Sequence, residues 1–234
     1  PTSRASVFDI DTQGSTGDGK APAFRFGGYV DLQISRIVTS TANNILSTRL
    51  IGSNYVDADT SDALAINTGI KWHYNNGVET SVVTNSNNYS WMWKRAPKFF
   101  DAVYYEGNGS NRTITHNLGV IPEMMWIKNT SSAEDWAVYY GDATDYLRLN
   151  GGFATTDDNT YWNDTAPTST VFTVGTNDSV NHNAENHIAL LFATLSGISK
   201  IGTFSHTNGS STDVDCGFSS GSKFVLVKRT DTTG

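Results

Sequence analysis

The sequence has little of what marks disulfide-bonded, nucleic-acid-binding or membrane-spanning proteins. Cys216 is the single cysteine, so no disulfide can form within the chain. Charged residues make up only 17% of the 234 residues, the net charge is −7, and no basic run exceeds two residues. Nucleic-acid binding is therefore not expected, because it needs a clustered positive face. No run of about 20 apolar residues predicts a membrane-spanning helix, so membrane insertion is not expected either.

The residues that are abundant favour short strands joined by turns. Ser, Thr, Asn, Asp and Gly are frequent, and 12% of the residues are aromatic. Ile70, Trp72 and Tyr74 alternate with polar residues, which is typical of a half-buried strand. The segment 124–127 is apolar without alternation, which predicts a strand covered on both faces. Together, short strands with frequent turns predict an all-β fold of the sandwich or jelly-roll kind.

The chain resembles itself at an offset of 100 residues. Residues 124–130 read MMWIKNT and fall on residues 224–230, which read FVLVKRT. The Asn-Gly pair at 108–109 falls on the pair at 208–209, and Phe24 falls on Met124. Several matching blocks at one offset predict a tandem duplication.

The duplication predicts tandem β-sandwich or jelly-roll-like modules of about 100 residues, with a truncated third copy. The expected domains are an N-terminal attachment segment at 1–18, a divergent first β-module at 19–98, a second β-module at 99–198, and the start of a third module at 199–234. Because that third copy would lack its later strands, we expect the sequence to be a piece of a longer protein.

Two motifs carry a resemblance to a known family. Residues 114–140 read ITHNLGVIPEMMWIKNTSSAEDWAVYY, and residues 161–176 read YWNDTAPTSTVFTVGT. The chain from about residue 95 to 234 resembles repeat modules of tail-fibre and tail-associated proteins of tailed bacteriophages, especially marine ones. This resemblance implies a virion structural role on a tail appendage, a homotrimer and a lectin-type jelly roll. It implies no catalytic residues.

We therefore expect a non-enzymatic structural component of a phage tail appendage, either a tail fibre or a fibre adaptor. Its N-terminal part would dock on other tail proteins, and it would space a distal region that contacts a host-surface glycan. It would be assembled in the host cytoplasm and located in the virion tail. Two alternatives stay open: a glycan-binding adsorption module and a polysaccharide-degrading tailspike.

The histidines and paired aspartates give no metal-binding pattern. His182 and His187 lie five residues apart in a polar stretch and lack the spacing of zinc ligands. Two aspartate pairs could contact Ca²⁺, but neither lies in a calcium-loop pattern, so they are interpreted as turn carboxylates; these are Asp142 with Asp145 and Asp157 with Asp158. No metal or cofactor is predicted.

The remaining candidates for chemistry are also weak. Glu134 and Asp135 are adjacent, so on a strand they would point to opposite faces, which argues against an acid–base pair for glycan cleavage. Cys216 lies in a strand-like pattern, where a small buried apolar residue is the favoured interpretation over a nucleophile. No catalytic residue is predicted.

Four aromatic residues are the candidate contact residues: Trp136, Tyr139, Tyr161 and Trp162. Exposed rings beside Asn- and Asp-rich loops can stack on sugars. Tyrosine and tryptophan also concentrate at subunit contacts. Most of these rings are interpreted as core or subunit-interface residues, with glycan binding as the alternative.

Overall fold

The computed structural model describes residues 1, 3–12, 22–41, 43–80 and 87–231. The first half of the chain forms the 3₁₀ turns η1 (Arg4–Ser6) and η2 (Arg49–Ile51) and the strands β1 (Phe8–Thr12), β2 (Phe24–Arg25), β3 (Leu32–Ile37), β4 (Ile45–Thr48), β5 (Val56–Asp57), β6 (Gly77–Val78) and β7 (Asn88–Trp93). The second half forms β8 (Phe100–Glu106), β9 (Arg112–Thr115), β10 (Met124–Asn129), β11 (Ala137–Tyr139), β12 (Asp145–Arg148), β13 (Thr156–Asp157), α1 (Asn159–Trp162), β14 (Val171–Val174), α2 (Asp178–Asn181) and β15 (Asn186–Phe192).

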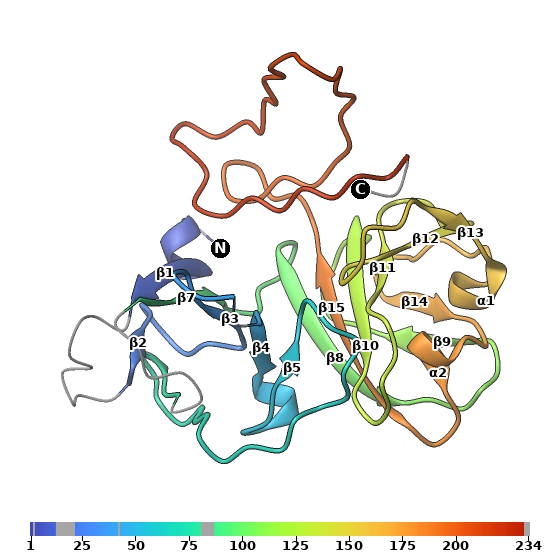
Figure 1. Ribbon diagram of the computed structural model, residues 1–234, viewed down its shortest axis with the longest axis horizontal. Helices are drawn as coiled ribbons and strands as arrows, with labels where there is room; N and C mark the ends of the chain where they lie inside the picture. The colour runs from blue at the N-terminus through green and yellow to red at the C-terminus, as the bar shows by residue number, and fades with distance from the viewer. Residues whose placement is uncertain (2, 13–21, 42, 81–86, 232–234) are drawn as a thin grey trace.

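Two antiparallel sheets dominate the molecule. The first sheet has the strand order β1-β7-β3-β4-β5, and the second has the order β13-β12-β11-β10-β15-β8. Two smaller sheets, β2-β6 and β14-β9, complete the strands. The large sheets stand side by side in Figure 1, with the small sheets on the outside of each. This architecture confirms the all-β prediction.

The large sheets pack face to face over a shared apolar core. The first sheet contributes residues such as Leu32, Leu46 and Trp93, and the second contributes residues such as Trp126 and Leu190. A second core lies between the second sheet and the layer of β9, β14, α1 and α2. A third core lies between the first sheet and the layer of β2 and β6. The molecule is therefore built of four layers.

The central strands of the second sheet are apolar on both sides because each side faces a core. In β15, Ile188 and Leu190 point into the shared core, whereas Ala189 and Leu191 point into the outer one. Strand β10 is buried along nearly its whole length, as the unbroken apolar run predicted. Period-2 alternation explains how one strand serves both layers.

Short polar elements close the outer layer of the second sheet. Asp158 is the N-cap of helix α1, and its side chain accepts a hydrogen bond from the amide of Thr160. Beside it, Gly175 lies so close to α1 that a β-carbon would be 2.1 Å from the carbonyl oxygen of Thr160. Only glycine fits there, because the contact is with backbone and cannot be relieved by a rotamer change.

The five strands of the first sheet share their order with five of the six strands of the second sheet, in which β13 is an additional edge strand. In each, the first strand of the unit is followed across the sheet by the last, the third, the fourth and the fifth: β1-β7-β3-β4-β5 in one and β8-β15-β10-β11-β12 in the other. The outer pairs β2-β6 and β9-β14 also occupy equivalent places in chain order. A duplication remains our inference from this shared order.

The single offset of 100 residues is wrong as a residue-by-residue alignment. Phe24 lies in β2 of an outer sheet, whereas Met124 begins the central strand β10. Equivalent strands β3 and β10 start 124 − 32 = 92 residues apart, whereas β7 and β15 start 186 − 88 = 98 residues apart. The spacing drifts because the loops of the two units differ in length, so no single offset aligns every strand.

The expected domain limits fit the strands unevenly. The limit at 98/99 falls between β7 and β8. The attachment segment expected at 1–18 is partly a sheet strand, because Phe8–Thr12 pairs with β7 as β1; its residues 13–18 are outside the described part. Residues 199–231, called here the C-terminal segment, contain no strand and loop over one end of both sheets (Figure 1).

Candidate functional site

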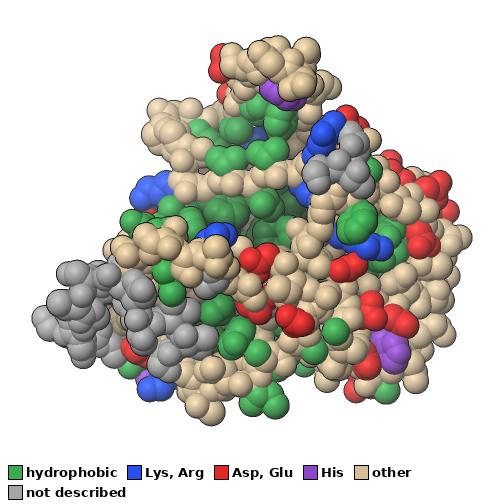
Figure 2. All heavy atoms as spheres, in the orientation of Figure 1, with side chains coloured by type: hydrophobic (Ala, Val, Ile, Leu, Met, Phe, Trp, Pro, Cys, Tyr) green, Lys and Arg blue, Asp and Glu red, His purple; other side chains and the backbone are tan. Residues whose placement is uncertain are grey.

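An apolar cavity of about 760 Å³ lies between the C-terminal segment and the ends of the large sheets. Phe8 and Trp93 line it from the first sheet, and Met124, Trp126 and Phe192 line it from the second. Figure 2 shows hydrophobic side chains gathered in the hollow beneath the segment. The cavity thus exposes the end of the shared core to the underside of the segment.

Phe224 anchors the C-terminal segment over this cavity. Its ring meets the ring of Trp93 edge-on, with a centroid distance of 5.2 Å and an interplanar angle of 87°. Its centroid lies 6.2 Å from that of Phe8 and 6.4 Å from that of Trp91. Edge-to-face geometry is favourable for aromatic pairs. One side chain therefore provides the main apolar contact that residues 224–230 make with the first sheet.

Polar contacts on both sides of Phe224 are few and peripheral. The Nζ atom of Lys223 lies 3.4 Å from Oδ1 of Asp9, and both side chains are partly exposed. The amide of Thr155 donates to the carbonyl oxygen of Thr230 over 3.0 Å. Exposed ion pairs of this kind contribute about 0–1 kcal/mol. These peripheral contacts therefore add little to the apolar contact that Phe224 makes.

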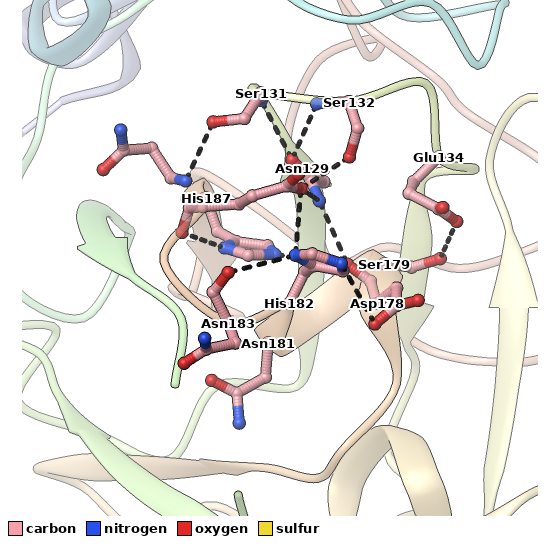
Figure 3. A network of polar contacts seen from close by, with 12 residues as sticks. Asn129, Ser131, Ser132, Glu134, Asp178, Ser179, Asn181, His182, Asn183 and His187 are labelled. Carbon is pink, nitrogen blue, oxygen red and sulfur yellow. Dashed lines mark hydrogen bonds and ion pairs between the residues drawn. The ribbon is translucent and has the colours of Figure 1, made fainter. Parts of the chain in front are cut away.

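A dense polar network occupies the opposite region of the second sheet, around α2 and the turn after β10 (Figure 3). Oε2 of Glu185 accepts hydrogen bonds from Ser132 Oγ over 2.5 Å and from Asn129 Nδ2 over 2.6 Å. These two donors hold the pKa of Glu185 below its usual range. Asn129 Oδ1 in turn accepts from the amides of Ser131 and Ser132. The network ties the end of β10 to the start of β15.

His187 is the buried titratable group of this network. Its Nδ1 lies 3.1 Å from the carbonyl oxygen of Glu185, and its Nε2 lies 3.3 Å from that of Asp178. The ring stacks on Tyr105 with a centroid distance of 5.3 Å. Burial lowers the pKa of His187 despite these carbonyl oxygens, so the neutral form is favoured. His182 lies closer to solvent, with Nδ1 3.5 Å from Oε2 of Glu185.

This network joins α2 and the turn after β10 by side-chain hydrogen bonds. Within the described ranges, no three His, Cys, Asp or Glu side chains are grouped as potential metal ligands. Oε2 of Glu134 accepts from Ser179 Oγ over 3.2 Å, whereas Asp135 pairs with Arg148 and accepts from Asn150. Both residues precede β11 and lie outside the strands, so the expected strand alternation does not apply to them. Their carboxylates nevertheless contact different partners.

Two of the four paired aspartates serve a turn and a helix cap, and the other two lie in strands. Asp142 accepts from both the amide and the hydroxyl of Thr144, which holds its pKa below the usual range. Asp145 accepts from the hydroxyl of Tyr140, and Asp158 caps α1. Asp142 and Asp158 therefore match the interpretation as turn carboxylates. For Asp145 and Asp157 that interpretation is wrong, because Asp145 begins β12, Asp157 ends β13, and the two residues pair across these strands.

The four aromatic candidates Trp136, Tyr139, Tyr161 and Trp162 lie inside the molecule, with exposures between 0 and 5%. Trp136 belongs to the shared core, and its Nε1 donates to the carbonyl oxygen of Asp57 in β5 over 2.9 Å. The other three belong to the outer core, where Tyr161 stacks on Tyr146 at 3.6 Å. The four rings are therefore packed in the interior of one chain, which is the core packing that the sequence left open.

Lys128 is a buried charge that sequence reasoning did not single out. Its side chain is fully buried at the end of β10, and Nζ donates to the carbonyl oxygens of Ser61, Asn129 and Glu134 over 2.8–3.1 Å. Burial lowers the pKa of Lys128 to about 8. Since Ser61 belongs to the first unit, this ammonium joins the two halves of the molecule. The sequence signal was a lysine directly after the apolar run at 124–127.

Cys216 is not the buried strand residue that its surroundings predicted. It is half-buried in the C-terminal segment, and its sulfur lies 3.7 Å from the carbonyl oxygen of Val214. The prediction failed because alternation alone does not bury a residue; the strand also needs partners, and this segment has none among the described residues.

A family model described as "Domain of unknown function (DUF7483)" matches residues 38–234. The chain belongs to this family. No curated protein and no solved structure matches the chain. The DUF7483 match begins just after β3 and takes in both the second sheet and the C-terminal segment. It therefore divides the first sheet rather than following one structural unit.

Within the DUF7483 region, Asn181 is a further residue that the sequence gave no reason to select. Its buried Nδ2 donates to the carbonyl oxygens of Ser110 over 2.8 Å and Gly175 over 2.7 Å. Its Oδ1 accepts from the amide of Asn108 over 3.0 Å. One amide group thus joins α2 to two loops, and only the fold distinguishes it from the many exposed asparagines nearby.

The described part of the chain has no helix of the length and hydrophobicity that a bilayer crossing requires.

Proposed function

We propose that the protein is a non-enzymatic structural component of a phage tail appendage, a tail fibre or a fibre adaptor. In this proposal its β-layers provide rigid spacing, its N-terminal part docks on other tail proteins, and a distal region meets the host surface. The proposal starts from the resemblance of residues 114–140 and 161–176 to tail-fibre modules. The mechanism is mechanical, so what matters is how the layers resist deformation.

The observation that carries the proposal is the use of the motif residues for packing. In the first motif, Trp126 and Trp136 lie in the shared core, and Ile127 lies in the outer core. In the second motif, Trp162 and Phe172 are fully buried in the outer core. The motifs that carry the resemblance are therefore determinants of architecture. A likeness in such residues supports a shared module, and it supports a structural role more than a catalytic one.

Association into a homotrimer is part of the same proposal. Strand β8 is seven residues long and forms one edge of the second sheet, and Tyr104 on it is 41% exposed. An edge strand presents backbone groups that another copy can pair with or cover. Light scattering on the purified chain measures this directly: the proposal expects three copies per particle, and a clean monomer at micromolar concentration contradicts the trimer.

The virion role is tested on the virus that encodes the chain. Antibodies raised against residues 1–234 are expected to label the tail in electron micrographs, and mass spectrometry of purified particles is expected to detect the protein. Particles purified from infected cells and washed at high salt provide the control for adsorbed contaminants. Absence of the protein from washed particles that contain the other tail proteins would refute the proposal.

A further inference from the structure

Four Asn-Gly pairs occur in the sequence, at residues 76–77, 108–109, 150–151 and 208–209. Glycine has no side chain to shield its backbone nitrogen, so this nitrogen can closely approach the side-chain carbonyl carbon of the preceding asparagine. Attack at that carbon releases the side-chain amide as ammonia. Hydrogen bonds to either group hold the two apart, so the four pairs differ in reactivity as far as their hydrogen bonds differ.

The pair Asn108-Gly109, which follows β8, is held by Asn181 of α2. The amide of Gly109 donates to the carbonyl oxygen of Asn181 over 2.8 Å. The side-chain oxygen of Asn108 accepts from the amide of Ser110 over 3.0 Å and from Nδ2 of Asn181 over 3.3 Å. Asn181 is fully buried, so its position is fixed by the fold. Attack within this pair would have to break hydrogen bonds of both reacting groups, which makes it unfavourable.

The first and third pairs of the chain are held in other ways. Gly77 lies in β6, where it pairs with Arg25 of β2. The side-chain oxygen of Asn150 accepts from the amide of Trp136 over 2.9 Å, and Nδ2 of Asn150 donates to Asp135 over 2.8 Å. Each of these pairs is therefore tied to a neighbouring strand or turn, which must open before the pair can rearrange.

The pair Asn208-Gly209 in the C-terminal segment has the same turn but none of these restraints. Gly209 has a left-handed φ angle of 82°, close to the 67° of Gly109. Both residues of the pair are exposed, and a β-carbon on Gly209 would have nothing within 4 Å. Within the described part of the chain, neither the side chain of Asn208 nor the amide of Gly209 makes a hydrogen bond. One exposed hydrogen bond, from the amide of Ser210 to the carbonyl oxygen of Thr207 over 3.1 Å, closes the turn, so it opens readily.

We propose that Asn208 is a modification site that converts spontaneously to aspartate and isoaspartate, whereas Asn108 stays an asparagine because Asn181 holds it. The amide nitrogen of Gly209 gives its proton to hydroxide and attacks Cγ of Asn208. The bond from Cγ to the side-chain nitrogen breaks, and ammonia leaves with a proton taken from water. Water then opens the resulting succinimide ring at either carbonyl, so the only co-reactant is the solvent. This inference does not depend on the phage proposal.

The test follows the intact chain at pH 8 by peptide mapping with mass spectrometry, in which the products separate from the asparagine peptides. Free peptides of residues 205–212, SHTNGSST, and 105–112, YEGNGSNR, supply the rates of the two pairs without a fold. In the chain, Asn208 is expected to convert at the rate of its free peptide. Asn108 is expected to convert at least about tenfold more slowly than its own free peptide. A chain in which Asn208 is as stable as Asn108 overturns the proposal.

A glycine variant tests the attacking nitrogen. Gly209→Ala is expected to slow the conversion of Asn208 about tenfold or more, because the new β-carbon hinders the nitrogen. Gly221→Ala is the matched control, since it makes the same change at another open position of the C-terminal segment, and it is expected to leave the rate at Asn208 unchanged. Equal rates at Asn208 in the two variants would overturn the proposed attack by the backbone nitrogen.

An asparagine variant tests the restraint on Asn108. Asn181→Ala is expected to speed the conversion of Asn108 about tenfold or more and to leave Asn208 unchanged. Asn150 is the internal control, because its rate stays low while the fold is intact. Urea that unfolds the wild-type chain is expected to bring Asn108 to the rate of its free peptide. A rate at Asn108 that rises in urea but not in Asn181→Ala would overturn the role of Asn181. If the variant also speeds Asn150, it has unfolded, and the wild-type comparison of chain, peptide and urea then decides.

Discussion

Replacing Trp136 by phenylalanine tests whether the two large sheets are held together as described. The indole is fully buried just before β11 of the second sheet, and it donates to the carbonyl oxygen of Asp57 in β5 of the first sheet. Phenylalanine keeps an aromatic ring in the shared core but removes the donor. The change therefore probes one hydrogen bond across the sheet interface together with the packing around it.

The expected cost follows from two losses. Loss of the hydrogen bond costs about 1 kcal/mol. The phenyl ring is smaller than the indole by about 40 Å³, which at ~24 cal/mol per Å³ of cavity adds about 1 kcal/mol. We expect the free energy of unfolding to fall by about 2 kcal/mol, and the melting temperature to fall by about 4–8 °C for a chain of this size.

Urea denaturation followed by circular dichroism measures this loss. The matched control is Trp91→Phe, the same change at a half-buried ring that also borders the shared core, where we expect a loss below about 1 kcal/mol. A loss below about 0.5 kcal/mol for Trp136→Phe, or a larger loss for Trp91→Phe, would refute the reasoning. The first result would mean that the contact between the sheets does not depend on this ring, and the second would mean that burial of the ring does not set the cost of the change.

Three further predictions concern close packing and pH. Gly175→Ala is expected to lower the free energy of unfolding, measured by urea denaturation, by about 2–3 kcal/mol, because the new β-carbon would overlap the carbonyl oxygen of Thr160. The control Gly221→Ala has open space around it and is expected to stay within about 0.5 kcal/mol of wild type. Because the pKa of Lys128 is lowered to about 8, the unfolded chain binds more protons than the folded chain above pH 8, and the free energy of unfolding is expected to rise from pH 8 to about 10. Lys128→Met is expected to flatten that rise. An equal rise in the variant would contradict the assignment. Because the pKa of His187 is lowered, the unfolded chain takes up a proton before the folded chain does, below about pH 6.5. The free energy of unfolding is therefore expected to fall on acidification from pH 7 to 5, and to fall less steeply in His187→Gln. An equal dependence of stability on pH in the two proteins would contradict a buried neutral histidine.

The sequence predicted local structure well and strand pairing poorly. The unbroken apolar run at Met124 correctly indicated a strand covered on both faces, because a strand between two cores needs apolar residues at every position. The place of β7 between β1 and β3 was not predictable in this way. That pairing joins Phe8 to Trp93 across most of a unit, and no local pattern encodes a partner at such a distance along the chain.

The aromatic candidates show why the site was harder to predict than the fold. Tyr161 and Trp162 stand next to Asn163 and Asp164, and such polar neighbours suggested an exposed loop. In the structure they form the short helix α1, which ends with Asn163 in a left-handed conformation. The two rings turn into the outer core while the polar residues turn to solvent. A sequence without regular periodicity does not reveal which way a single helical turn faces.

Comparison of equivalent positions in β3 and β10 separates the constant face of the unit from the variable one. On the inner face, Leu32 and Ile34 correspond to Met124 and Trp126, and all four border the shared core. The adjacent strands follow the same rule, since Leu46 of β4 and Val138 of β11 lie in the same core.

On the outer face, the first sheet carries buried polar side chains where the second carries apolar ones. Gln33 and Ser35 occupy the places of Met125 and Ile127, and Ser47 occupies that of Tyr139. Polar atoms of Gln33, Ser35 and Ser47 are buried without a hydrogen-bond partner in the described structure, whereas the second sheet buries apolar side chains against α1, α2, β9 and β14. If the units arose from one ancestor, the inner face kept its character because each unit covers the other, and the outer faces diverged because each has its own cover. The mutual packing of the two sheets is then the property that this architecture depends on most. Because the indole of Trp136 bridges the two sheets, replacing it tests this packing most directly.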